Sequence, residues 1–300
     1  MKIKKKKGLF FTLTAILLVT LTLVFPVKKI NLRKYDVEAL RADQLNSLIS
    51  NLENDFENAL EIALTRATWA MIKSIENNKA IENATESYKE LILNGTLNGI
   101  ENDFMRNSTI KSYEETVKEL LNDYGIEINF NNKELSIYQQ DPFTLTAKLK
   151  VEISLKDKAN IASWKNSTNI IARISIEDFP DPLWLANGKN NIIKKASYVD
   201  CSNFRDHLEN HRYNSSNKAP SFLLRLENKT IENEYGIESF IKHNDYWYFD
   251  YIYFNPNSVA NLNCSVRLDS TLHEFKKIDS SEHLKAYCKE IKCLEIKQKV

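Results

Sequence analysis

Apolar residues dominate the segment from Gly8 to Val27, which contains no charged side chain. Its 20 residues correspond to about 30 Å of helix, the thickness of the hydrocarbon core of a membrane. A cleavable secretory signal is the alternative, but its apolar region is shorter and ends in small residues, whereas this run ends with Phe25-Pro26-Val27. The pattern therefore predicts one transmembrane helix that stays in the protein.

From Asp36 to about Glu76, apolar residues recur every three or four positions. This spacing places them on one face of a helix, while charged residues occupy the other face. We predict one long amphipathic helix with a buried stripe, followed by shorter helices near Asn83–Leu93 and Ser108–Tyr124. Gly125 is the expected C-cap of the last helix, because glycine readily adopts the left-handed conformation found there. The stripe consists of Leu45, Leu48, Ile49, Leu52, Phe56, Ala59, Leu60, Ala63, Ala67, Ala70 and Met71.

Strict alternation of apolar and polar residues replaces this spacing from Phe143 to Leu155. A period of two predicts an antiparallel strand with one solvated face. Apolar residues also alternate on both sides of Asn131-Asn132, where we predict a hairpin turn because asparagine tolerates positive φ. A further strand is predicted at Ile170–Ile176. Together these segments predict a four-stranded antiparallel sheet within residues 126–177.

The polar run Asn187–Asn191 marks a predicted boundary after the sheet. Beyond it the patterns indicate mixed α+β structure, with helices near 202–211 and 280–290 and strands at 221–226 and 246–254. The predicted fold class is therefore α+β, in which a transmembrane helix continues into an amphipathic helix, followed by an antiparallel sheet and a mixed C-terminal part. The predicted regions are a basic leader and anchor (1–35), a helical region (36–125), the sheet (126–186) and a cysteine-containing α+β region (187–300).

Charge indicates how the chain is oriented in the membrane and which partners it lacks. Lys and Arg number 41 against 40 Asp and Glu, a net charge of +1, so no basic excess predicts nucleic-acid binding. Basic residues flank the apolar run on both sides and are slightly more numerous before it, which favours a cytoplasmic N-terminus. We therefore expect a single-pass protein of the cell membrane with an extracytoplasmic C-terminal domain.

Cysteines and glycosylation sequons agree with an exported domain. The four cysteines all lie in the last third of the chain, and an even number in an exported domain favours disulfides, with three possible pairings. Reduced, buried cysteines in a cytoplasmic domain are the alternative. Seven N-x-[ST] sequons are mild evidence for a glycoprotein, because chance alone gives about four at this composition. The residues are Cys201, Cys264, Cys288 and Cys293, and Asn83, Asn94, Asn107, Asn166, Asn214, Asn228 and Asn263.

Candidate catalytic and metal-binding residues do not form a recognisable motif. His207 and His211 are four residues apart, as two ligands on a helix would be, but the zinc-protease motif needs Glu directly after the first His, and Glu209 stands two positions after it. A solvated helix face is the better interpretation, so we expect no metal and no cofactor. Ser221 lacks the G-x-S-x-G elbow. The aromatic run Tyr246–Phe254 is interpreted as a core strand, with a carbohydrate- or partner-binding platform as the alternative.

The N-terminus from Lys4 to Leu13, with four lysines, Gly8 and then the apolar run, resembles the class III signal peptide of archaeal type IV pilin-like proteins. The resemblance implies that a prepilin peptidase cleaves between Gly8 and Leu9 and leaves the helix in the mature protein. The order of hydrophobic helix, amphipathic helix and antiparallel sheet is also similar to the layout of this family. Family members usually carry Glu five residues after the cleavage site, at Leu13 here, and members without it tend to be minor or tip-type subunits.

The leading hypothesis is a non-catalytic, membrane-anchored pilin-like or minor-pilin-like subunit of a surface filament or secretion apparatus. Its partners would be the lipid bilayer, other pilin-like subunits and a prepilin peptidase. In the alternative hypothesis, the chain is a bitopic surface protein that binds a ligand or glycan through its extracytoplasmic domain. An anchored enzyme of unrecognised type is the third hypothesis, and we do not expect the protein to be an enzyme.

Overall fold

The computed structural model describes residues 34–158, 162–197, 210–243, 246–255, 265–267 and 274–276. The chain divides into two compact units, Met1–Leu45 and Asn46–Val300. Only residues 34–45 of the first unit are described, so the architecture below is that of the second unit. The predicted transmembrane helix, Gly8–Val27, lies outside the described residues. Among the helices that are described, none combines the length and the apolar character that a membrane span requires.

One long helix, α2 (Lys34–Glu76), confirms the predicted amphipathic helix. From Asn46 onward its apolar stripe is buried in the hydrophobic core, with Phe56 and Leu60 completely inaccessible to solvent. The ring centroid of Phe56 lies 4.8 Å from that of Tyr113 and 5.6 Å from that of Phe130. Because Tyr113 belongs to a neighbouring helix and Phe130 to the sheet, the stripe holds α2 against both.

Two shorter helices with a small hairpin between them confirm the predictions near 83–93 and 108–124. Both helices begin at polar caps: the Asn83 side chain accepts a backbone N–H of the first helix, and Thr109 and Ser112 form a capping box at the second. The C-cap of the second helix is Tyr124, and the predicted Gly125 follows it with a φ of +73°. The elements are α3 (Ala84–Asn94), β1 (Thr96–Leu97), β2 (Ile100–Glu101), η1 (Asp103–Met105) and α4 (Ile110–Asp123).

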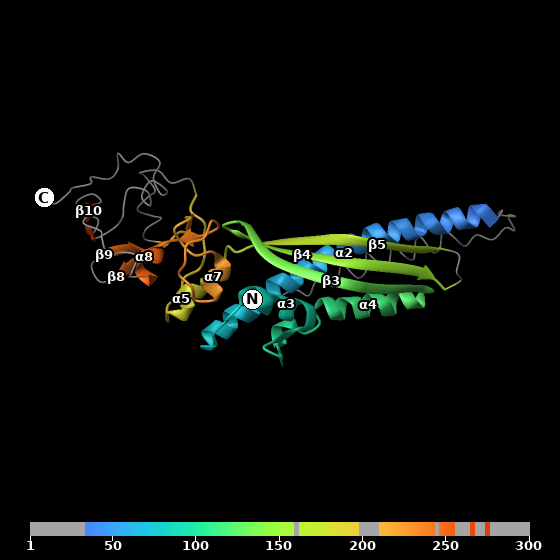
Figure 1. Ribbon diagram of the computed structural model, residues 1–300, viewed down its shortest axis with the longest axis horizontal. Helices are drawn as coiled ribbons and strands as arrows, with labels where there is room; N and C mark the ends of the chain where they lie inside the picture. Colours follow the sequence, from blue (N-terminus) through green and yellow to red (C-terminus); the bar gives the residue numbers. More distant parts are fainter. Residues whose placement is uncertain are drawn as a thin grey trace, which may run out of the picture. The chain divides into compact units, whose positions relative to one another are not determined.

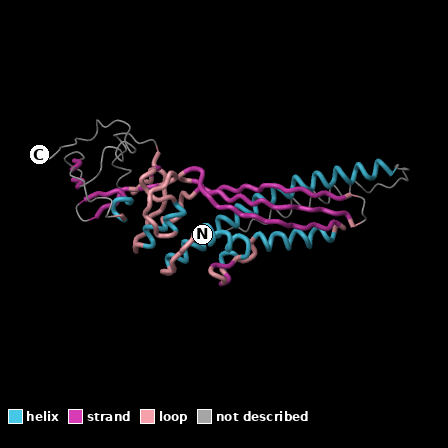
Figure 2. Tube along the Cα trace, viewed as in Figure 1, coloured by secondary structure: helices cyan, strands magenta, loops and turns pink. Residues whose placement is uncertain are grey.

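Three long antiparallel strands form the main sheet in the order β3-β4-β5. Every second side chain of β4 from Leu145 to Leu155 is buried, whereas those between them are half-buried or exposed apart from Thr146, which agrees with the predicted alternation. Helices α3 and α4 pack against β3, and Figures 1 and 2 show α2 running along the same strands. The strands are β3 (Ile126–Asp141), β4 (Thr144–Asp157) and β5 (Ser163–Ser175).

The hairpin predicted at Asn131-Asn132 is wrong, and the sheet has three strands where four were predicted. Strand β3 continues through both asparagines, and its register with β4 shifts between Asn131 and Glu134. Asn132 adopts a φ of +51°. Asparagine tolerates this positive φ, and here it forms a bulge within one strand instead of a turn between two strands. The true hairpin turn follows at Pro142, where the Asp141 carboxylate accepts the N–H of Phe143 at 3.0 Å.

The residues after the sheet form short helices and short antiparallel strand pairs, β6 with β7, β8 with β9 and β10 with β11. Ile193, Phe222 and Ile237 belong to the same hydrophobic core as the sheet, so this core continues past the polar run Asn187–Asn191. The elements are α5 (Pro182–Ala186), β6 (Asn214–Ser215), α7 (Phe222–Leu226), β7 (Ile237–Glu238), β8 (Phe240–His243), β9 (Tyr246–Phe249), α8 (Asp250–Phe254), β10 (Ser265–Arg267) and β11 (Glu274–Lys276).

Two predictions for this region need correction. The strand predicted at 221–226 is wrong: Phe222–Leu226 form helix α7, in which Phe222 and Leu226, four positions apart, lie on one buried face. The strand predicted at 246–254 ends at Phe249, and α8 follows. A nearly continuous aromatic run fits the period of a strand and that of a helix, so its pattern does not show where one ends and the other begins. The helix predicted near 280–290 lies outside the described residues, as does nearly all of that near 202–211. The α+β class with antiparallel sheets is confirmed.

Candidate functional site

Several of the predicted site residues lie outside the described part of the chain. The cleavage site, the disulfide candidates and half of the histidine pair belong to this group, so their predictions stay untested. They are Gly8, Leu9, Cys201, Cys264, Cys288, Cys293, His207, Glu209 and Asn263.

Six sequon asparagines are described, and five of them are exposed. Asn214, in β6, is half-buried. An exposed side chain is the first requirement for attaching a glycan, so the structure leaves these five positions sterically available. The exposed residues are Asn83, Asn94, Asn107, Asn166 and Asn228.

His211 and Ser221 occupy positions with structural roles. His211 is half-buried in a turn with a φ of +48°, and its ring centroid lies 5.4 Å from that of Trp184. Ser221 is buried and directly precedes α7. The described residues contain no group of three His, Cys, Asp or Glu side chains that could hold a metal ion. In the aromatic run, Phe249 and Tyr251 are buried, as a core position requires.

A buried ionic cluster joins separate elements of the C-terminal part. The guanidinium of Arg225, in α7, donates to Oδ2 of Asp181 at 2.6 Å and to Oδ2 of Asp250 at 2.9 Å. It also donates to two backbone carbonyls. The hydroxyl of Tyr213 donates to Oδ2 of Asp181 at 2.6 Å. All four side chains are completely buried, so the cluster is an internal link between α5, α7 and α8.

Buried Glu238 adds a third carboxyl group whose charge acts on Asp250. The pKa of Asp250 is raised to about 7, because burial and the charges of Glu238 and Asp181 raise it by more than Arg225 lowers it. Oδ1 of Asp250 has no hydrogen-bond partner among the described residues. Burial disfavours the charge of Arg225, but the carboxylates outweigh this effect and raise its pKa. The guanidinium therefore stays charged, while Asp250 holds a proton up to neutral pH.

The cluster was not predicted from the sequence, although one signal was available. Arg225 stands within the otherwise apolar segment Phe222–Leu226, and an arginine in such a segment requires buried acidic partners if the segment enters the core. Because its side chains are sealed from solvent, the cluster is a structural feature and offers no binding surface.

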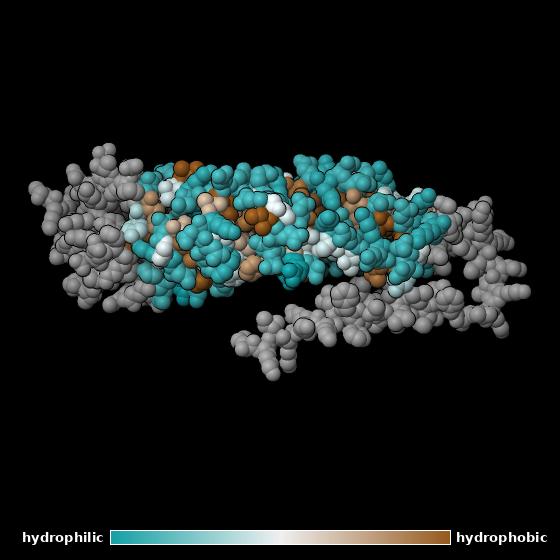
Figure 3. Space-filling model, turned by 90° about the horizontal axis from the view of Figure 1, so that it is seen from below, coloured by the Kyte–Doolittle hydropathy of each residue, from teal (hydrophilic) through white to brown (hydrophobic). Residues whose placement is uncertain are grey.

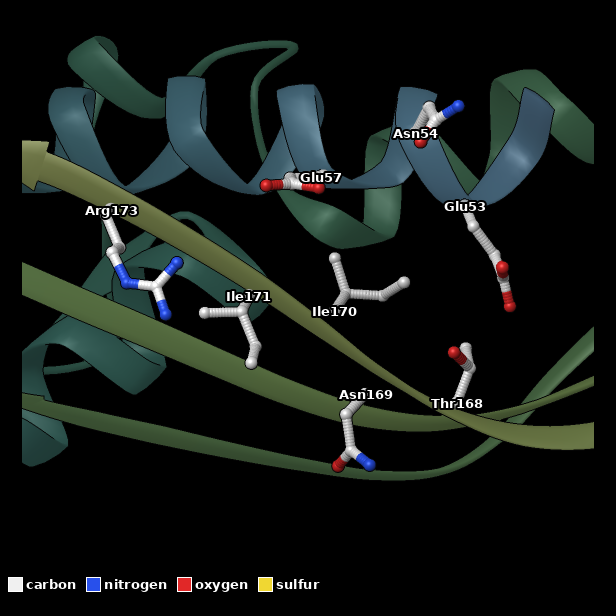
Figure 4. A pocket seen from close by; sticks show the side chains of 8 residues that line it. All are labelled: Glu53, Asn54, Glu57, Thr168, Asn169, Ile170, Ile171 and Arg173. Atoms are coloured by element: carbon white, nitrogen blue, oxygen red, sulfur yellow. The ribbon is translucent and has the colours of Figure 1, made fainter. Parts of the chain in front are cut away.

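An open cleft lies between α2 and strand β5 (Figure 4). Its volume is about 320 Å³, and its lining is Glu53, Asn54 and Glu57 from α2 and residues 168–171 and Arg173 from β5. The three charged side chains of this lining take part in no ion pair with another described residue. Their charges are therefore available to a bound molecule.

The two edges of the sheet differ. Strand β3 has register shifts between Asn131 and Glu134 and between Gln139 and Asp141, and α3 and α4 pack against it. Strand β5 pairs with β4 along its whole length without a shift and, within the described part, has no second strand partner. Bulges and covering helices protect a sheet edge from further pairing. Strand β5 is therefore the open edge, and the cleft runs beside it.

The rest of the described surface is mainly hydrophilic on the face drawn in Figure 3, with separate hydrophobic patches. Two exposed apolar side chains, Ile62 and Trp69, lie on α2 one heptad apart. Between them, Arg66 donates to the backbone carbonyls of Phe104 and Arg106. Scattered apolar side chains are normal on soluble surfaces and do not by themselves indicate a partner.

Comparisons with protein-family models, with the curated proteins and with the solved structures found no match to the chain. The interpretation of the cleft and of the open edge therefore depends on their own geometry and charge.

Proposed function

We propose that the protein is a non-catalytic, membrane-anchored pilin-like or minor-pilin-like subunit of a surface filament or secretion apparatus, with its folded part extracytoplasmic. In this proposal Gly8 precedes the processing site and the segment Leu9–Val27 is the anchor. The subunit would pack its anchor against those of other pilin-like subunits, and the enzymatic steps would belong to partners such as a prepilin peptidase.

The observation that carries the proposal is helix α2. It begins at Lys34, soon after the predicted anchor, and has 43 residues. The stripe from Leu52 to Ile75 is buried in the core that the antiparallel sheet shares. A long helix whose later part packs on an antiparallel sheet agrees with the pilin-like layout that the N-terminal residues imply.

Determining the N-terminus of the membrane-extracted protein tests this proposal directly. By N-terminal sequencing and intact mass, we expect a mature chain that starts at Leu9 and a Gly8→Val variant that stays uncut. A wild-type chain that still starts at Met1 would contradict the prepilin version. Recovery of the protein in sheared surface fractions tests filament incorporation separately.

The cleft favours a second candidate function, a bitopic surface protein that binds a ligand or glycan. Its lining is polar and carries both signs of charge, from Glu53, Glu57 and Arg173. A volume of about 320 Å³ lies at the lower end of the range for small-molecule sites. An uncut protein that binds small polar molecules or glycans in this cleft would support this candidate.

A further inference from the structure

Strand β5 has backbone groups available for a further strand. In an antiparallel sheet, alternate residues point their N–H and C=O groups to opposite neighbours. β5 has 13 residues and pairs with β4 on one side without a shift. Within the described part, the groups that point the other way meet no strand. This arrangement is the template that strand addition uses.

The cleft gives this edge a particular chemistry. The side of β5 that faces α2 is overhung by Glu53 and Glu57, and on the opposite side Arg173 is exposed. The two glutamates are four residues apart on a helix, which corresponds to about 6 Å along its axis. Alternate residues of a strand are about 6.7 Å apart and lie on the same face. Two basic side chains at alternate strand positions therefore match both the spacing and the charge of the glutamates.

We propose that the open edge of β5 binds an extended segment of a partner protein by strand addition. The segment would carry two basic side chains at alternate positions toward Glu53 and Glu57 and an acidic side chain on its other face, toward Arg173. Backbone hydrogen bonds to β5 hold the segment, and the charges of the cleft select its register and its sequence. The proposal does not depend on cleavage at Gly8, and its test fails or succeeds separately from N-terminal sequencing.

A second copy of strand β5 matches this chemistry poorly. The face of β5 that packs toward α2 carries Asn166, Thr168 and Ile170, none of which is basic. Its basic residues, Lys165 and Arg173, lie on the other face, where a copy would meet the same two charges. Charge complementarity therefore favours a different chain over self-pairing.

Titration of the full-length protein, purified in mild detergent, with short synthetic peptides tests the proposal. The first peptide has a Lys-Glu-Lys centre flanked by threonines, and the second has the reversed Glu-Lys-Glu centre. We expect the wild type to bind the first peptide at least about tenfold more tightly than the second. The variant carrying Glu53→Lys and Glu57→Lys should reverse this preference.

Control variants and a control peptide separate strand addition from simple charge attraction. Glu61→Lys, exposed on the same helix but outside the cleft, should leave the preference unchanged. Methylating the backbone nitrogens of the three central residues of the first peptide removes their N–H donors, keeps all three charges, and should abolish binding. Equal binding of the methylated peptide, or an unchanged preference in the double variant, would overturn the proposal.

Two further outcomes would also overturn it. One is the absence of binding of either charged peptide to the wild type up to about 1 mM. The other is a self-associated wild type whose sedimentation changes in the double variant, because the edge would then join copies of this chain. The substitution Arg173→Gln should weaken binding of the first peptide several-fold. Lys156→Gln, at an exposed position of β4, should leave the binding of this peptide unchanged.

Discussion

The buried carboxyl groups of Asp181 and Asp250 both accept from Arg225, and Asp250 holds a proton up to a pKa of about 7. In the unfolded chain Asp250 releases this proton near its ordinary pKa of 3.8, whereas in the folded protein its pKa is about 7. Between these values the folded state binds more protons than the unfolded state. The contribution of Asp250 to the free energy of unfolding is therefore full at low pH and is lost as pH rises through 7.

Replacement of Asp250 by Asn should remove this pH dependence. Asn keeps an oxygen that can accept from Arg225 but has no proton to lose, so the fall in stability between pH 5 and pH 8 should be smaller in the variant than in the wild type. Denaturant midpoints at both pH values measure the difference. Asp123→Asn, at an exposed site of α4, should follow the wild type, and an equal fall in all three proteins would contradict the assignment.

The cluster also shows where sequence patterns stop being informative at the residue scale. The carboxylates that accept from Arg225 belong to Asp181 and Asp250, which are 44 and 25 residues away along the chain. No periodicity links those positions, since each acid stands at the start of a different short helix. Helix caps depend on shorter separations, because Asn83 and Thr109 act on backbone groups only three residues away.

At the scale of elements, helix α2 and strand β4 were predictable because each has one buried face and therefore one clear periodicity. Strand β3 was divided wrongly, because Asn131 and Asn132 suit a turn and a bulge equally well. The sequence predicts a strand where helix α7 lies, because five residues are too few for the periods of a helix and a strand to differ. The cleft beside β5 could not be predicted at all, since it depends on how α2 lies against the sheet.

Phe56 should be the main contact between α2 and its neighbours. Its ring is completely buried and contacts Tyr113 of α4 and Phe130 of β3. Replacement by Ala removes those contacts and leaves a cavity, so we expect a loss of about 3–5 kcal/mol in the free energy of unfolding.

Ile62→Ala is the matched control, because this residue lies on the same helix and is 53% exposed. The free energy of unfolding of this variant should stay within about 0.5 kcal/mol of the wild-type value. Urea unfolding followed by far-ultraviolet circular dichroism measures both variants. Equal effects would mean that the apolar stripe of α2 does not hold the helix on the sheet.

At the scale of the whole molecule, the proposal places the folded part outside the cell. All four cysteines lie in this part of the sequence, so a membrane-impermeant maleimide should label intact cells after mild reduction. Permeabilised cells provide the control, because they expose both sides of the membrane. Labelling that requires permeabilisation would contradict the proposed orientation and, with it, the expected disulfides.

The two edges of the β3-β4-β5 sheet differ, and this difference limits how many further strands can pair with the sheet. The β3 edge is bulged and lies under helices, and the β5 edge is regular and open within the described residues. A sheet with one receptive side accepts a single incoming strand and cannot pass the pairing on through its far side. Strand pairing at this sheet would thus have a valence of one, which ends a ladder of paired strands instead of extending it.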